Sequence, residues 1–245
     1  GVHDKPKGTG KNLKAQTELW LQTLGWKQQI EKLQKLKKNP NETLHFFDWK
    51  LDFPEIMNEQ VTDKVGFDIV IGNPPYIQLQ KENGLLANLY KNSNFKTFER
   101  TGDIYSLFYE KGINLLNYKG NICYITSNKW MKAGYGNSLR KLFCNYDTLK
   151  LIDLGAGIFE TATVDTNIII LRKIKNITHK TLALDISKEK ILKPFEKYSS
   201  NWITLNELNE DIWNIINPIE FNIKQKAEKL GKPLKDWDIK INYGI

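Results

Sequence analysis

Four consecutive residues, Asn73-Pro74-Pro75-Tyr76, have the side chains and carbonyls to hold a planar amino group for chemistry. An exocyclic amino or amide nitrogen is a poor nucleophile because its lone pair is delocalised into the ring or the carbonyl. The side-chain oxygen of Asn73 and the backbone carbonyl of Pro74 could accept both N–H bonds and favour density on the attacking lone pair. The prolines fix φ and remove two backbone donors, and Tyr76 could stack on the group being held. The alternative is a rigid turn with Tyr76 as a core aromatic.

The segments that position this motif are predicted to alternate between strands and helices, which is typical of an α/β fold. Residues 67–71 form a compact apolar run, typical of a strand buried on both faces, which ends at Gly72 directly before Asn73. Ligands of open α/β sheets bind outside the carboxyl ends of strands, so this position suits a site. The pattern after the motif predicts helix, strand, helix, strand and strand, in that order, over residues 104–117, 121–126, 138–145, 149–154 and 167–171.

The rest of the chain is predicted to flank this domain. Apolar spacing predicts a helix over 17–38 and a short strand over 44–49. The polar stretch 77–102 is longer than a simple connection between two elements needs, so we interpret it as a candidate substrate-binding loop. The pattern changes again near residues 180–200. We therefore predict three parts: a helical lead-in (1–43), the catalytic half of an α/β domain (44–185), and a linker that begins a recognition region (186–245).

Composition excludes several classes of protein. The chain has 245 residues and a mean hydropathy of −0.48, with no apolar run near the ~20 residues that span a bilayer, so a membrane protein is excluded. Residues 1–20 show no signal peptide. Cys123 and Cys144 are the only cysteines, which excludes a disulfide scaffold and a cysteine-rich zinc site, and no metal is predicted. A cytoplasmic location follows as an expectation.

The net charge is consistent with a polyanionic partner. Thirty-six Lys and Arg against 28 Asp and Glu give +8 and an isoelectric point near 9.2. Cations set against phosphates release counterions, which favours binding to DNA or RNA. A soluble protein that is merely basic explains the charge equally well.

The motif Asn73-Pro74-Pro75-Tyr76 resembles the catalytic motif of amino-group methyltransferases that use S-adenosyl-L-methionine, above all the DNA adenine-N6 enzymes. An ordered series of segments over about residues 44–175 also looks like the type IIG restriction-modification enzymes of the Eco57I-like family, and the series is far more specific than any one segment. The segments are Phe46-Phe47-Asp48-Trp49, Phe53-Pro54-Glu55, Gly66–Tyr76, Asp103–Phe108, Gly120–Trp130 with Ser138-Leu139-Arg140, and Ile158–Val164.

The resemblance implies a fold, a cofactor and a partner. The fold would be a Rossmann-like methyltransferase sheet, mostly parallel with an antiparallel last strand, of which this chain holds the catalytic half. The cofactor would be S-adenosyl-L-methionine. The partner would be double-stranded DNA with a flipped adenine, because the adenine amino nitrogen cannot be reached inside a stacked duplex. The function implied is methylation of adenine N6 within a restriction-modification system.

The resemblance also assigns site residues. Asn73 and Pro74, in the motif with Pro75, would hold the adenine amino group, and Tyr76 would stack on the base. Phe159 would stack on its opposite face. Asp48 would lie near the adenosine of the cofactor and Phe108 near its adenine. The alternatives are that Phe159 and Phe108 are core residues and that Asp48 is a helix cap or a surface acid.

One feature of the family pattern is missing. Family members open their sheet with a glycine-rich loop that reads like Pro-x-Cys-Gly-x-Gly and wraps the methionine end of the cofactor. Gly8-Thr9-Gly10 lacks a preceding strand, and Gly155-Ala156-Gly157 follows the catalytic motif, so neither qualifies. We therefore expect an internal piece of a larger enzyme, with the rest of the parent chain as its partner, which could be inactive alone.

Other functions remain open at the level of sequence. Protein-glutamine methyltransferases share an Asn-Pro-Pro-Tyr motif and hold a glutamine amide in the same way, and RNA adenine is a further possible substrate. A non-catalytic DNA-binding or assembly module is the alternative from another class. Restriction cleavage by this stretch is not expected because it shows no convincing Pro-Asp…Glu-x-Lys cluster. Methyl transfer to an amine needs no general base, which fits the absence of an obvious catalytic histidine.

Overall fold

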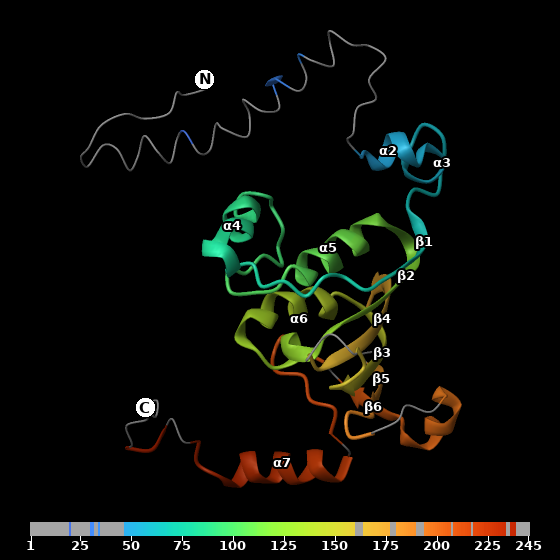
Figure 1. The fold of residues 1–245 in the computed structure, drawn as a ribbon. Coiled ribbons are helices and arrows are strands. Elements are labelled where there is room, and N and C mark those ends of the chain that lie inside the picture. The colour runs from blue at the N-terminus through green and yellow to red at the C-terminus, as the bar shows by residue number, and fades with distance from the viewer. Residues whose placement is uncertain are drawn as a thin grey trace, which may run out of the picture. The chain divides into compact units, whose positions relative to one another are not determined.

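The structure is a computed structural model in which the chain divides into two compact units, Gly1–Asp52 and Phe53–Ile245. Each unit is described by itself (Figure 1). The described residues are Trp20, Ile30, Glu31, Gln34 and the ranges 47–159, 164–176, 180–189, 194–206, 208–216, 218–233 and 236–238. The predicted helix over 17–38 therefore lies almost wholly outside the described residues.

The described part of the second unit is built on a six-stranded mixed sheet with the strand order β1-β2-β4-β3-β5-β6. β1 is parallel to β2 and β3 is parallel to β5, whereas β4 is antiparallel to both of its neighbours and β6 is antiparallel to β5. Four strands therefore run in one direction and end at one edge of the sheet. This confirms the predicted α/β class. The strands are β1 (Phe67–Gly72), β2 (Leu116–Ser127), β3 (Tyr146–Gly155), β4 (Thr166–Lys175), β5 (Lys180–Asp185) and β6 (Ile203–Asn206).

Two helices cover one face of this sheet. α5 (Tyr105–Leu115) and α6 (Asn137–Cys144) share the main hydrophobic core with β2, β4 and β3. A Cβ at Gly112 would lie 2.6 Å from Ile122 Cδ1 and from Tyr124 Oη, so glycine allows α5 to approach β2 closely. The remaining helices are α2 (Trp49–Asp52), α3 (Pro54–Met57), α4 (Lys81–Tyr90), α7 (Pro218–Leu230), and the 3-10 turns η1 (Asn128–Met131), η2 (Gly134–Gly136) and η3 (Phe195–Asn201).

β1 differs from the prediction in its burial. The strand was expected to be buried on both faces, but among the described residues it pairs with β2 alone and forms an edge of the described sheet. Ile69 and Ile71 are 66% and 77% exposed, whereas Val70, on the face that α5 covers, is half-buried against the main core. An apolar run is typical of both a central strand and an incompletely covered one, so the sequence pattern could not separate the two.

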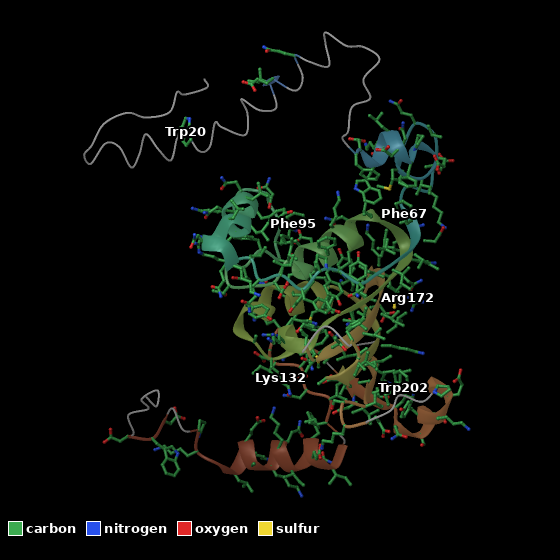
Figure 2. The ribbon with its side chains drawn as sticks, viewed as in Figure 1. Trp20, Phe67, Phe95, Lys132, Arg172 and Trp202 are labelled. Atoms are coloured by element: carbon green, nitrogen blue, oxygen red, sulfur yellow. The ribbon has the colours of Figure 1, made fainter. Side chains whose placement is uncertain are left out.

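The stretch 77–102 is not a loop throughout. It contains α4, whose Ala87 packs with Leu79 against Ile104 and Leu107 at the start of α5. Phe95 packs against the same small core (Figure 2). α4 and Phe95 therefore form an ordered cover over the first turns of α5. A role for it in binding substrate stays a prediction.

The strand predicted over 44–49 is wrong where the structure describes it. Phe47 and Asp48 have no regular structure, and Trp49 begins α2. The reason is a local cap: Asp48 Oδ1 accepts hydrogen bonds from the N–H groups of Lys50, at 2.8 Å, and Leu51, at 3.2 Å. An aspartate that caps a helix in this way competes with extended structure.

The sheet also continues past the strand that the sequence indicated as its last. The predicted strand 167–171 is β4, and it is antiparallel as expected, but it lies between β2 and β3, and β5 and β6 follow it. β6 and the buried Trp213 come from the segment predicted to begin a recognition region. The three-part division of the chain stays a prediction. No helix among the described residues is both long and apolar enough to span a membrane.

Candidate active site at the carboxyl edge of the sheet

The Asn-Pro-Pro-Tyr turn leaves the carboxyl end of β1, where Gly72 pairs with Tyr124 of β2. Asn73 is exposed, whereas the following Pro74 is buried and anchors the turn. Tyr76 is half-buried, and its hydroxyl donates a long hydrogen bond of 3.4 Å to the carbonyl of Ile125 in β2. Burial raises the pKa of the Tyr76 hydroxyl, so this group stays a donor at neutral pH. The turn is therefore held in place by Pro74 and Tyr76, and Asn73 is left exposed on it.

Two other aromatic rings lie against Tyr76. The ring centroids of Tyr76 and Phe159 are 6.5 Å apart with an interplanar angle of 61°, and those of Tyr76 and Tyr105 are 6.4 Å apart at 86°. The structure therefore brings together two residues that are 83 positions apart in the sequence. In this arrangement the rings of Tyr76 and Phe159 contact each other edge to face. A base held between them requires the rings to turn parallel and separate.

The loop that carries Phe159 begins at the end of β3, where a glycine bend and hydrogen bonds to Asp153 hold it in place. Gly155 has φ +68°, and a Cβ there would lie 2.7 Å from the backbone of Ser187, so glycine is required at this bend. Asp153 Oδ1 accepts hydrogen bonds from Asn128 Nδ2, at 3.0 Å, and from the Gly155 N–H, at 3.1 Å. Burial raises the pKa of Asp153, and these two donors partly oppose the shift. Asp153 therefore ties the start of the Phe159 loop to η1.

The segment after β2 completes this edge. The N–H of Asn128 donates to the carbonyl of Asp165, just before β4, at 2.9 Å. Trp130 is fully buried and donates from Nε1 to Asn167 Oδ1 at 3.1 Å. The ends of β1, β2 and β3 and the start of β4 therefore meet around Tyr76 and Phe159. Residues 160–163 of the predicted Phe159 segment lie outside the described residues.

Phe108 is exposed on α5. Its exposed fraction is 40%, one turn after Tyr105, so the alternative of a core residue does not hold. An exposed aromatic side chain is available to stack on a planar ligand. Its predicted place beside the adenine of a cofactor stays a prediction.

Asp48 belongs to the first unit, whereas the turn at Asn73 belongs to the second. Its carboxylate caps α2, as one of the alternatives from the sequence proposed. A role for Asp48 near the adenosine of the cofactor stays a prediction, and it would require the carboxylate to serve both functions. Among the described residues, no cluster of three or more His, Cys, Asp or Glu is arranged to hold a metal ion.

Sequence reasoning missed one buried acid beside this site. Asp103 is 8% exposed and forms an isolated bridge with Gln78, two residues after Tyr76. Burial raises its pKa to about 6, and the charges of Lys129 and Lys81 act in the opposite direction. The sequence could have indicated this acid, because an aspartate stands directly before an apolar helix. The same pattern is typical of an ordinary helix cap. Only the pairing of 77–79 with 102–104 separates the two interpretations.

The segments that form this site match a known protein family. Residues 12–159 match the model of the Eco57I restriction-modification methylase family, a range that contains Asp48, Asn73 and Phe108 and ends at Phe159. The chain belongs to this family. The resemblance found in the sequence is therefore confirmed at the level of family.

Curated relatives of this Eco57I-family chain are type II restriction-modification proteins. The type II restriction enzyme and methyltransferase RM.Eco57I of Escherichia coli is 28% identical over 67% of this chain and 17% of its own length. The type II methyltransferase M.PaeR7I of Pseudomonas aeruginosa is 36% identical over 35% of this chain and 15% of its own length. The chain thus spans about a sixth of the length of these relatives.

Among solved structures, this Eco57I-family chain is similar to the methyltransferase subunit of a type I restriction-modification system from Streptococcus thermophilus. The two share 21% sequence identity with a TM-score of 0.41, and the match covers 78% of this chain and 36% of that one.

Proposed function

We propose that this chain is the methyltransferase portion of an enzyme that methylates adenine N6 in double-stranded DNA, within a restriction-modification system. The observation that carries the proposal is the exposed Asn73 on a proline-fixed turn beside Tyr76, whose ring contacts Phe159. Membership of the Eco57I methylase family supports it. We also propose that the rest of the parent chain is the partner that completes the enzyme.

In this mechanism the chain holds and orients the amino group. Asn73 Oδ1 and the Pro74 carbonyl accept the two N–H bonds of the adenine amino group, which favours electron density on its lone pair. Tyr76 and Phe159 separate and stack on the two faces of the flipped base, which repays part of the cost of unstacking it. Positioning supplies most of the rate acceleration. The ammonium product is acidic enough to lose its proton to solvent.

The cofactor is proposed to be S-adenosyl-L-methionine, which supplies an electrophilic methyl group on a sulfonium. The residues present fit its adenosine end at Phe108, because this side chain is exposed and can stack on a purine. Asp48 is proposed, as the resemblance implies, to lie near the adenosine of the cofactor. The methionine end needs donors and acceptors that the predicted site residues do not supply, in line with the missing glycine-rich loop. The parent chain is proposed to provide them.

The experiment is a transfer assay with methyl-labelled S-adenosyl-L-methionine and the full-length protein that contains this chain. We expect label on adenine of duplex DNA, recovered as N6-methyladenine after digestion. A shared Asn-Pro-Pro-Tyr motif makes protein glutamine the competing substrate, and RNA is a third. Label on protein glutamine or RNA with none on DNA would refute the proposal, and no transfer to any of the three would favour a non-catalytic module.

Phe159→Ala is expected to weaken the stabilisation of the flipped base by about 1–3 kcal/mol, the range for base–aromatic stacking. The measurement is the fluorescence of DNA with 2-aminopurine at the target adenine, titrated with the full-length protein. Phe159 is only half-buried, so the midpoint of thermal unfolding should change little. Unchanged fluorescence with a lowered midpoint would mean that Phe159 is a packing residue and would contradict its role as a platform.

A further inference from the structure

Asn128 is the first residue of η1 and follows β2 directly, at the edge of the sheet where the Asn-Pro-Pro-Tyr turn leaves β1. It is half-buried, and its backbone and its side chain both donate hydrogen bonds to other segments. The start of η1 is itself well fixed, because the Ser127 side chain accepts the Lys129 N–H and Trp130 is fully buried. The site residues that the family resemblance implies do not include Asn128.

The start of the loop that carries Phe159 is bonded to the side chain of Asn128. Asn128 Nδ2 donates to Asp153 Oδ1 at 3.0 Å, and the same oxygen accepts the Gly155 N–H at 3.1 Å. A hydrogen bond to a carboxylate is about twice as strong as one between neutral groups. The ladder between β3 and β4 is irregular here, since its register shifts between Asp153 and Gly155. The side-chain bonds therefore supply fixation at a point where regular strand pairing is interrupted.

The end of the same loop is bonded to the backbone of Asn128. The Asn128 N–H donates to the carbonyl of Asp165 at 2.9 Å, and Asp165 directly precedes β4. The two ends also meet each other, because Gly155 pairs with Thr166 across β3 and β4. One residue therefore bonds both ends of the connection from β3 to β4, and Phe159 lies in this connection.

The chemistry of an asparagine side chain suits this position. Its amide supplies an N–H donor without a charge, whereas an aspartate at position 128 would set two carboxylates against each other. Without the amide, Asp153 Oδ1 would keep the bond from the Gly155 N–H but lose its link to η1. The bend at the start of the loop would then be free to shift relative to β2.

We propose that Asn128 is a positioning residue that holds both ends of the Phe159 loop and so keeps the Phe159 ring beside Tyr76. The effect on a flipped base rests on the proposed function, whereas the hold on the loop does not. Asn128 acts through Asp153 and the backbone of the loop, and it does not touch the reacting atoms.

The first test is Asn128→Ala in the full-length protein, with 2-aminopurine at the target adenine of duplex DNA. The substitution removes the bond to Asp153 and keeps the backbone bond to Asp165. We expect the equilibrium constant for the flipped, stacked base to fall about 3- to 10-fold, the loss for one hydrogen bond. The matched control is Asn117→Ala, which removes a 2.9 Å bond from a buried asparagine to Asp68 at the amino ends of β1 and β2. This control should lower stability and leave the fluorescence titration unchanged.

A double-mutant cycle separates positioning of Phe159 from a general loss of structure. If Asn128 acts through the Phe159 ring, adding Asn128→Ala to Phe159→Ala should change the titration by less than about twofold. Equal losses in the two backgrounds would mean that Asn128 supports the fold without positioning Phe159, and would overturn the proposal.

Hydrogen exchange of the protein without DNA tests the hold on the loop by itself. Exchange of the backbone over residues 154–158 should become about 3- to 10-fold faster in Asn128→Ala and stay unchanged in Asn117→Ala. Unchanged exchange in Asn128→Ala would overturn the proposal. Faster exchange in a protein that transfers no methyl to DNA would support the hold on the loop and refute the proposed function.

Discussion

Replacing Asn73 by alanine is expected to lower kcat for methyl transfer by about 10³-fold, which would abolish detectable modification. The substitution removes the side-chain oxygen that accepts one N–H of the adenine amino group, so the group loses both its orientation and the polarisation of its lone pair. Asn73 is exposed, so the free energy of unfolding should change by less than about 0.5 kcal/mol. The measurement is single-turnover transfer of labelled methyl to duplex DNA at saturating cofactor.

Two variants make this result specific. Asn114→Ala removes another exposed asparagine, near the far end of α5, and should leave kcat unchanged. Asn73→Asp keeps an oxygen acceptor at the same place and should be more active than Asn73→Ala. If Asn73→Ala retained more than a tenth of the parent rate, the turn would not hold the amino group and the proposed mechanism would be wrong.

Trp130→Ala is expected to lower the free energy of unfolding by about 3–5 kcal/mol, the usual loss for truncating a buried aromatic residue. Trp130 is 0% exposed, and its ring packs edge to face on Phe143, at 5.1 Å, and on Trp213, at 5.3 Å. Its Nε1–H donates to Asn167 Oδ1, so the substitution also leaves a buried acceptor with one donor fewer. Urea unfolding followed by circular dichroism measures the loss.

This substitution should also release the segment around Trp213. The Trp213 N–H donates to the Met131 carbonyl at 2.9 Å, next to Trp130, and its Nε1–H donates to the Asn209 carbonyl at 2.6 Å. Proteolysis of 208–216 should therefore become faster in Trp130→Ala. Trp237→Ala is the control, because Trp237 is 53% exposed and should cost less than about 1 kcal/mol. Equal losses for the two variants would mean that Trp130 does not organise this core.

The positions of elements could be predicted where the signal is local. Helical spacing after Ile104 predicts 104–117, and α5 occupies Tyr105–Leu115; the apolar run at Asn167 lies inside β4. Both patterns reflect which side chains must leave water within one turn or one strand. The prediction of a strand failed over 47–49, the described part of 44–49, because one hydrogen-bonding side chain, Asp48, outweighed an apolar pattern.

The Asn-Pro-Pro-Tyr motif and its place after a strand were readable from the sequence because the chemistry, the rigidity and the strand end all lie within ten residues. The contacts between distant segments were not. The packing of Tyr76 on Phe159 and Tyr105, the bridge from Asp103 to Gln78, the place of β4 between β2 and β3 and the exposure of Ile71 each depend on which segments pair in space.

Sequence alone therefore determined the order of helices and strands from α5 to β4, the motif and the family, because each is encoded by neighbouring residues. Tertiary structure decided which described strand is an edge, which aspartate is buried beside the turn, and that Tyr105 also meets Tyr76. Pairing over tens of residues is set by the collective packing of the core, and short-range periodicity carries no information about it.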